Sequence, residues 1–365
     1  GSRFEALRAR AKLSQLVGRD HEIAQLREFW QQARDGAGRA VAISGEAGIG
    51  KSRLALHVRG LVGDGPLAVL TYSCAPHYQQ SALLPVVNHL ENAAGFKRSD
   101  SAEARLDKLE SMLKSLELEA APIVPLYASL LAVPTGARYA PLDLSPRLLK
   151  EKTFAALEEQ LAAVAARQPV LIVFEDLHWV DPTTLELLDR VIKRVRQSRI
   201  LMIITVRPSF HASWLYQNCS TIHLNRLSYS EAAAIIADVS GAKPLPEAVV
   251  QHILDKADGV PLYVEELTRS MIESGQLREL TDRFEIAKPL SEFAVPSTLR
   301  DLLTARLDRL GTAKQVAEVG AAIGRQFSYE LLRAVMPSNE QRTREALERL
   351  IDSRLVDCTG APPHS

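Results

Sequence analysis

The feature that most constrains the fold is a glycine-rich stretch between an apolar run and an amphipathic run. Residues 40–56 read AVAISGEAGIGKSRLAL, and Gly45 to Ser52 fit the pattern G-x-x-x-x-G-K-[ST]. The residues before Gly45 are typical of a strand and those after Lys51 of a helix. Glycines let the backbone curl so that successive N–H groups converge on phosphate oxygens at a helix N-terminus. The stretch therefore predicts a phosphate-binding loop in an α/β sheet.

The individual residues of this loop have separate expected roles. We expect Lys51 to reach the β- and γ-phosphates of a nucleotide and the Ser52 hydroxyl to ligate Mg²⁺. The other residues expected to line the phosphates are Gly45, Glu46, Ala47, Gly48, Ile49, Gly50 and Arg53. A purely structural glycine-rich connector is the alternative, and the flanking strand and helix patterns argue against it.

Composition limits the classes of partner. Lys plus Arg and Asp plus Glu both number 44 among 365 residues, so net charge gives no argument for nucleic acid or an anionic membrane. Three widely separated cysteines, without CxxC spacing, indicate neither a disulfide framework nor a zinc site. We expect a reducing, cytoplasmic setting, and we find neither an apolar run of about 18 residues nor a signal peptide.

Four short apolar runs predict a parallel sheet. Residues 39–45, 67–74, 169–176 and 199–207 are rich in Val, Ile and Leu, as expected of strands buried on both faces. Helical stretches lie between them, two of which begin with a capping residue and proline, at Ser145-Pro146 and Asp181-Pro182. This alternation predicts a doubly wound α/β sheet with helices on both faces.

The length and the change of pattern predict several domains. We expect a linker at 1–13, a nucleotide-binding domain at 14–224, a helical subdomain at 225–290 and a winged-helix-like subdomain at 291–365. The third segment opens with a capping box at Ser228 and Glu231 and looks helical up to residue 280. The last is expected to hold three or four short helices, the final one capped by Ser338, and a terminal strand at 355–358. We also expect the chain to be a fragment of a longer protein.

An acidic pair follows the third apolar run. Glu175 and Asp176 leave a buried strand at its carboxyl end, where ligands collect in open α/β sheets. One carboxylate would hold Mg²⁺ and the other would orient or deprotonate an attacking water. Which of the two ligands the metal stays open.

Further residues bear on which nucleotide the chain binds. Arg207 ends another buried strand and is a candidate sensor of the γ-phosphate. Adenine is favoured over guanine because the chain has no NKxD sequence. No HExxH or GxSxG occurs, and balanced charges along the last predicted helix argue against direct DNA contact.

Six motifs occur together in the order found in one known family. They are LVGRDHEIAQL, the phosphate loop, VFEDLHWVDPTTLELL, TVRP, DGVPLYVEELTRSMIESG and VPSTLRDLLTARLDRL with IGRQFSYELL. Nearly the whole chain thereby resembles STAND-type P-loop ATPases of the AAA-related branch. It is most similar to the ATPase region of bacterial multidomain proteins that carry a class III adenylate/guanylate cyclase domain upstream and TPR-like helical repeats downstream.

The resemblance implies roles for further residues. The VGR-E motif falls on Val17, Gly18 and Arg19, with backbone of the first two lining adenine and Asp20 in place of the usual Glu. The G-x-P motif places Pro261 near the base, and the strand-end arginine of the family matches Arg207. The acidic pair departs from the usual Asp-Asp or Asp-Glu, which affects metal ligation and the efficiency of hydrolysis.

The resemblance also implies a function. In this family the exchange of ADP for ATP acts as a switch, and we expect hydrolysis to be slow. The resemblance implies a cytoplasmic signalling protein in which the partners of this chain are a cyclase-like domain and helical repeats. It also implies possible self-assembly. Two alternatives stay open. One is a DNA-associated ATPase, either of a LuxR-type transcription regulator or like origin-recognition proteins, and the other is a small-molecule P-loop kinase.

Overall fold

The computed structural model describes residues 16–61, 67–97, 99–287, 299–324, 327–336, 339–353, 355, 356 and 358. These residues form two compact units, each described by itself below. One unit comprises the described parts of Gly1–Asp20, Glu46–Leu56 and Leu224–Ser365, and the other comprises His21–Gly45 and His57–His223.

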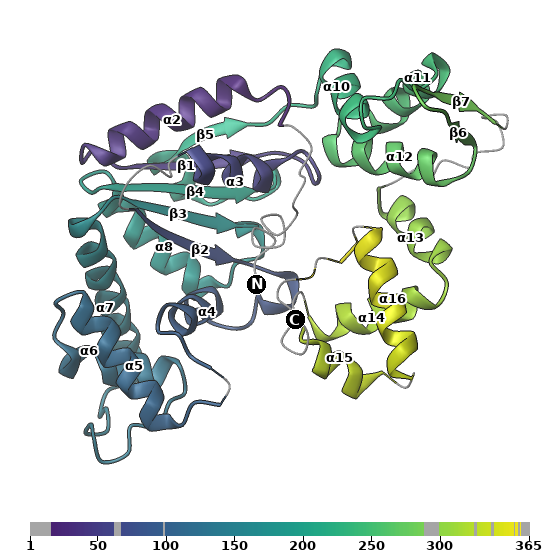
Figure 1. The fold of residues 1–365 in the computed structure, drawn as a ribbon. Coiled ribbons are helices and arrows are strands. Elements are labelled where there is room, and N and C mark those ends of the chain that lie inside the picture. Colours follow the sequence, from purple (N-terminus) through teal and green to yellow (C-terminus); the bar gives the residue numbers. More distant parts are fainter. Residues whose placement is uncertain are drawn as a thin grey trace. The chain divides into compact units, whose positions relative to one another are not determined.

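The second unit is built on a parallel five-stranded sheet with the strand order β2-β3-β4-β1-β5 (Figure 1). The strands are β1 (Arg39–Ser44), β2 (Ala68–Ser73), β3 (Val170–Glu175), β4 (Ile200–Val206) and β5 (Ser220–His223). The four strands predicted from the apolar runs are confirmed, and β5 was not predicted. All residues of β3 and β4 are buried. The expectation of full burial is wrong for β2, which is half-buried because it forms one edge of the sheet.

Helices flank this sheet. They are α2 (Asp20–Arg34), α3 (Lys51–Leu61), α7 (Pro146–Arg167), α8 (Pro182–Val195) and the short α9 (Ser213–Asn218). The two predicted caps are present: the Ser145 side chain accepts from the Leu148 N–H, and Asp181 accepts from the N–H groups of Thr183 and Thr184. Each cap satisfies donors that the first helical turn leaves unpaired, which fixes where α7 and α8 begin.

A helical insertion between β2 and α7 was not predicted. It consists of α4 (Leu84–Ala93), α5 (Ala102–Ser115) and α6 (Ala120–Leu130), which lie together in Figure 1. The insertion shares an apolar core with α7 and α8, in which Leu90, Leu109 and Tyr127 of the insertion and Phe154 of α7 are almost completely buried. The Tyr127 hydroxyl donates to the Ala156 carbonyl at 3.1 Å and lies 2.6 Å from the Gln160 side chain, so the insertion is bonded to α7.

The first unit contains a three-helix group followed by a hairpin. The helices are α10 (Tyr229–Val239), α11 (Glu247–Ala257) and α12 (Pro261–Glu273), and the hairpin pairs β6 (Leu277–Glu279) with β7 (Phe284–Ile286). The expectation of helix up to residue 280 is therefore wrong at its end. The chain turns at Gly275, whose φ is 72°. Leu277 and Phe284 then join the apolar core of the helices, which favours a strand at this point.

Four short helices complete the described chain: α13 (Leu299–Arg309), α14 (Thr312–Ile323), α15 (Tyr329–Val335) and α16 (Glu340–Asp352). Asn339 caps α16, and the expected cap Ser338 lies outside the described residues. Leu355 and Val356, expected in a strand, are bends whose N–H groups both donate to the Leu350 carbonyl. No helix that the structure describes is long and apolar enough to cross a membrane.

Candidate nucleotide-binding site

The phosphate loop, Gly45–Ser52, connects the end of β1 to the start of α3. Gly48 and Gly50 have φ angles of 80° and 106°, which side chains rarely adopt, so the loop needs glycine there. The Lys51 Nζ donates to the Glu46 carbonyl at 2.8 Å, and Lys51 is only 8% exposed. A buried ammonium at the first residue of a helix concentrates positive charge where the helix dipole is also positive. The loop therefore has the chemistry of an anion site.

Arg53, in the first turn of α3, gives a second test of whether the residues fit a bound nucleotide. Its Nη1 forms an ion pair with Glu265 Oε1 at 2.6 Å, and both side chains are mostly buried. Its Nη2 is buried without a hydrogen-bond partner among the described residues. An unmatched buried donor costs free energy, which an oxygen acceptor would recover. The orphaned nitrogen beside the loop thus fits a phosphate or ribose oxygen.

The segment at residues 17–19 lies against α10 in the same unit. Gly18 has a φ of 67°, which other residues rarely adopt, and a Cβ there would lie 2.2 Å from Glu231 Oε1 and would displace that side chain. Glu231 also completes the predicted capping box with Ser228, and these hydrogen bonds lower the pKa of its carboxyl group. Val17 packs against the apolar core of the α10–α12 helices. The two residues expected to line adenine are therefore held by the helical group.

Arg19 makes backbone contacts. It is 5% exposed, and its guanidinium donates to the carbonyls of Asn225 at 2.7 Å, Ile49 at 3.5 Å and Gly18 at 3.4 Å. These bonds connect the segment before α2, the phosphate loop and the chain entering α10. The contacts in the structure are those of a positioning residue.

The turn Gly259–Val260–Pro261 touches the phosphate loop directly. Pro261 is the first residue of α12, and the N–H of the next residue, Leu262, donates to the Gly48 carbonyl at 3.2 Å. A Cβ on Gly48 would meet the side chains of Val260 and Leu262 at 3.2–3.3 Å. The resemblance indicated Pro261, whereas no local sequence signal pointed to Leu262.

Gly259 fixes the position of this turn. Its φ is 69°, and a Cβ there would lie 2.5 Å from the Leu227 carbonyl oxygen. The Leu227 N–H donates to the Gly259 carbonyl at 2.8 Å. The turn therefore requires glycine both for its backbone angles and for a close approach of two chain segments.

A third connection is an exposed charge cluster. Arg226 forms ion pairs with Glu46 of the phosphate loop, at 2.9 Å, and with Asp258. Together with Leu262–Gly48 and Arg53–Glu265, this makes three links between the loop and the helical group, which we call the loop–helix links. Sequence reasoning missed Arg226, Glu265 and Leu262 as partners of the loop, because charge pairs this far apart in the chain leave no local pattern.

The acidic pair and Arg207 belong to the other unit, at the carboxyl edge of its sheet. Glu175 is the last residue of β3 and is 1% exposed. Asp176 follows with a φ of 54°, and its N–H donates to Thr205 Oγ1 on the neighbouring strand β4 at 2.9 Å. A left-handed non-glycine residue costs roughly 1 kcal/mol and often marks a functional position. Neighbouring strands thus hold the backbone of the pair.

Arg207 follows directly after β4. It is exposed, and its guanidinium carbon lies 5.5 Å from the centroid of the Trp179 ring. This cation–π contact orients an otherwise mobile side chain at the strand end. Trp179 stands in the short helical turn Leu177–Trp179 that follows the acidic pair. The sheet brings Glu175, Asp176 and Arg207 to the same edge, because β3 and β4 are adjacent parallel strands.

The residue types fit Mg²⁺ held together with a nucleotide. Among the described residues there is no cluster of three His, Cys, Asp or Glu side chains that would form an all-protein metal site. Mg²⁺ is commonly held by one or two carboxylates plus substrate phosphates and keeps several waters. Ser52 in one unit, and Glu175 and Asp176 in the other, carry oxygen atoms of the kinds that Mg²⁺ binds.

Comparison with known proteins gives three findings. The AAA ATPase domain family matches residues 15–204. An uncharacterized protein of Rhizobium meliloti (strain 1021) is 29% identical over 330 residues, which cover 88% of this chain and 31% of that protein. The chain therefore spans about a third of this relative.

Among solved structures, a STAND protein of Pyrococcus horikoshii with a tetratricopeptide repeat sensor superimposes with a TM-score of 0.51 at 13% identity, covering 93% of this chain and 39% of that one. At this identity the likeness shows a shared fold. The Aeropyrum pernix ORC1 protein in complex with DNA gives a TM-score of 0.47 at 14% identity, over 96% of this chain and 87% of that chain. The motif order, the sheet with its glycine-rich loop, and a family match over more than half of the residues place this chain in the AAA ATPase domain family.

Proposed function

We propose that this chain is an ATP- and ADP-binding regulatory switch that hydrolyses ATP slowly, within a cytoplasmic multidomain signalling protein. The observation that carries the proposal is the backbone hydrogen bond from Leu262 to Gly48. It joins the segment that would hold the phosphates to the first turn of α12. A ligand at the loop and the position of the helical group would therefore influence each other.

The phosphate side of the site would work through Lys51 and Arg53. Lys51 would exchange its bond with the Glu46 carbonyl for phosphate oxygens. Arg53 has one nitrogen on Glu265 and a second, buried one that lacks a partner among the described residues, so it can take a phosphate oxygen without first leaving Glu265. Such a residue registers the ligand and transmits its presence to α12.

Hydrolysis would rest on the strand-end residues. Mg²⁺, when bound, would neutralise developing charge on the phosphates. One carboxylate of Glu175 and Asp176, with Ser52, would hold the ion, and the other would orient or deprotonate the attacking water. Arg207 would contact the γ-phosphate. The roles of Val17, Gly18 and Pro261 would be to line the adenine.

A switch requires that ATP and ADP bind two arrangements with different affinity, because only differential binding moves a conformational equilibrium. The loop–helix links supply the contacts that one arrangement has and the other would lack. Two of them involve charged side chains, Glu46 and Arg53, next to which the nucleotide would place several negative charges. The charge of the bound nucleotide thus acts on the links themselves.

Hydrogen exchange tests the switch. We expect peptides covering residues 259–268 to exchange at least about tenfold faster with Mg²⁺ and a non-hydrolysable ATP analogue than with Mg²⁺ and ADP, because the links open. Mass spectrometry measures this, and Lys51→Ala, which should bind neither nucleotide, serves as the control. Equal exchange with both nucleotides, each present at saturation, would contradict the switch.

The wider context follows from the length of the relatives and from the resemblance. The chain spans about a third of its Rhizobium relative, which supports a multidomain protein. We propose a nucleotide cyclase domain upstream and helical repeats downstream, with self-assembly in the ATP state.

The sequence of the full-length reading frame tests this context. A DNA-binding domain encoded next to this chain would instead favour a transcription regulator. ATP turnover measured alone, with DNA and with small acceptors separates the remaining alternatives, since phosphate appearing on an acceptor would indicate a kinase.

A further inference from the structure

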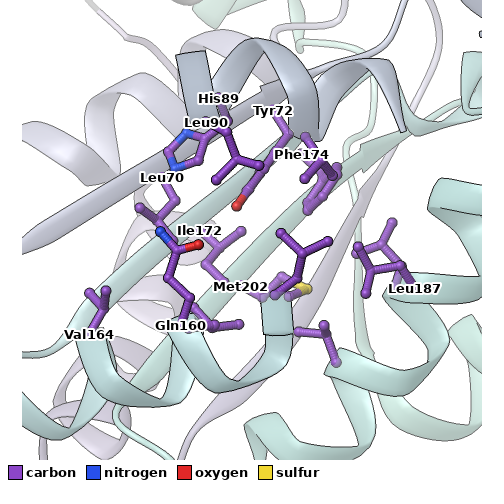
Figure 2. A pocket seen from close by; sticks show the side chains of 15 residues that line it. Leu70, Tyr72, His89, Leu90, Gln160, Val164, Ile172, Phe174, Leu187 and Met202 are labelled. Atoms are coloured by element: carbon purple, nitrogen blue, oxygen red, sulfur yellow. The ribbon is translucent and has the colours of Figure 1, made fainter. Parts of the chain in front are cut away.

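The sheet-containing unit has a cavity away from the strand ends. It lies between β2, β3 and β4 on one side and helices α4, α7 and α8 on the other (Figure 2). Twelve of its fifteen lining residues are Leu, Ile, Val, Met or Phe, and the remaining three are Tyr72, His89 and Gln160. All fifteen belong to the same unit.

The three polar residues form one edge of the cavity. Figure 2 shows the Tyr72 hydroxyl pointing into the space between His89 and Gln160. The rings of Tyr72 and His89 have centroids 4.8 Å apart. Gln160 is held from behind, because its side chain meets the Tyr127 hydroxyl at 2.6 Å and the Met112 sulfur at 3.9 Å. The polar groups are thus positioned by neighbours and still face the cavity.

The cavity is uncharged at neutral pH. Burial lowers the pKa of His89 to about 4, so its imidazole is neutral, and burial raises the pKa of Tyr72 far above neutrality. No Asp, Glu, Lys or Arg is among the lining residues. A charged ligand would lose its hydration without gaining a partner, whereas a neutral ligand pays no such penalty.

The size admits only a molecule smaller than benzene. The cavity volume is about 70 Å³. A single water needs about 10–15 Å³ by a comparable measure, and an engineered apolar cavity of about 150 Å³ binds benzene or xenon. The space therefore holds several atoms beyond one water. The apolar walls also disfavour filling it with water, since a buried water needs two to four polar partners.

We propose that this cavity is a binding site for a small uncharged ligand that is mostly apolar and carries one hydroxyl or carbonyl group. The apolar part would lie against the Leu, Ile and Met side chains of the sheet and α8. The polar group would bond with the Tyr72 hydroxyl and the Gln160 amide. The site is separate from the phosphate loop and does not depend on the proposed function.

The test is a titration of the 365-residue chain with 2-fluoroethanol and 1-fluoropropane, followed by ¹⁹F NMR. We expect saturable binding of 2-fluoroethanol with a dissociation constant below about 10 mM, and binding of 1-fluoropropane about fivefold weaker. The two probes have nearly the same shape and differ by a hydroxyl group in place of a methyl group. Absence of saturable binding for both would overturn the proposal.

Three variants locate the binding. Tyr72→Phe removes one hydroxyl, so the affinity for 2-fluoroethanol should fall about fivefold while the affinity for 1-fluoropropane stays within twofold. Val164→Phe and Leu187→Phe each fill space from opposite sides of the cavity, and both should abolish binding of both probes. Thermal unfolding of each filling variant shows whether it is folded, and binding is measured only for a variant that is. Unchanged binding in a folded filling variant places the ligand elsewhere and refutes the site.

Discussion

The phosphate loop and the end of strand β3 are held in place by different means. The loop is held largely by partners far along the chain: Gly48 bonds to Leu262, Glu46 to Arg226 and Arg53 to Glu265. The end of β3 is held by neighbouring strands, through bonds from Cys74 N–H to the Glu175 carbonyl and from Asp176 N–H to Thr205. The bonds of the first region reach the helical group, and these bonds of the second region lie within the sheet and at its strand ends.

Because the two regions are held differently, substitutions in them should have different effects. Changes at the strand end should alter hydrolysis and leave the helical group in place, because sheet bonds hold the backbone whichever side chains follow. Changes in the loop–helix links should alter stability and the response to nucleotide, because they act on a contact between distant segments. The predictions below test this contrast.

The largest effect is expected for Lys51→Ala. Loss of the ammonium should weaken ATP binding about 1,000-fold, since a buried charge that pairs with phosphate is removed. Isothermal titration measures the affinity, and circular dichroism should show an unchanged fold. ATP affinity within a few-fold of the parent would refute the assignment of the loop.

Glu175→Gln should lower ATP turnover about 100-fold and leave ATP affinity within a few-fold, because the amide keeps the shape of a side chain held by the sheet but loses its charge. Asp176→Asn is the matched variant, and the larger loss of turnover identifies the residue acting on water. If both variants turn over ATP at the parental rate, the strand end has no part in hydrolysis.

Gly259→Ala should lower the free energy of unfolding by about 2 kcal/mol, because the new Cβ combines an unfavourable φ with a clash at the Leu227 carbonyl. Gly241→Ala is the control, since Gly241 has nearly the same φ of 68° but nothing within 4 Å of the Cβ position. For Gly241→Ala we expect the free energy of unfolding to fall by about 1 kcal/mol. Denaturant unfolding measures both values, and equal losses would show that the turn is not closely packed.

The smallest expected effect is the difference in coupling energy between the buried and the exposed ion pair. Arg53 and Glu265 are 16% and 11% exposed, whereas Arg226 and Glu46 are 46% and 55% exposed. A double-mutant cycle should give a coupling energy of about 1 kcal/mol or more for the first pair and below about 0.5 kcal/mol for the second. A larger coupling energy for the exposed pair would mean that Glu46 and Arg226, and not Arg53 and Glu265 of α12, contribute more to the contact with the helical group.

Sequence patterns identified the regular parts of the molecule. Long apolar runs gave the strands β1 to β4, and side-chain caps gave the starts of α7, α8 and α10, because burial and capping are local properties. Strand β5 was missed because it has four residues, of which only Ile222 is buried. The helix α6 was missed because it contains Pro125, which usually ends a helix.

The candidate site was predictable in its motifs but not in its connections. A glycine-rich loop and an acidic strand end have fixed spacings that the chemistry of phosphate and metal requires. Arg226 and Glu265 pair with residues 180 and 212 positions away, and no spacing rule relates them. Such pairs become visible only when the fold brings the segments together.

The long-range links have a consequence for synthesis. Residue 265 is made 212 residues after residue 53. At about 5–20 residues per second, roughly 10–40 s pass between them on the ribosome. Until the end of that interval the nascent chain lacks at least one of the partners that hold the phosphate loop and the start of α3 in the finished protein. A nucleotide that binds during this time would meet an incomplete site, so the order of translation would delay the proposed response to ATP.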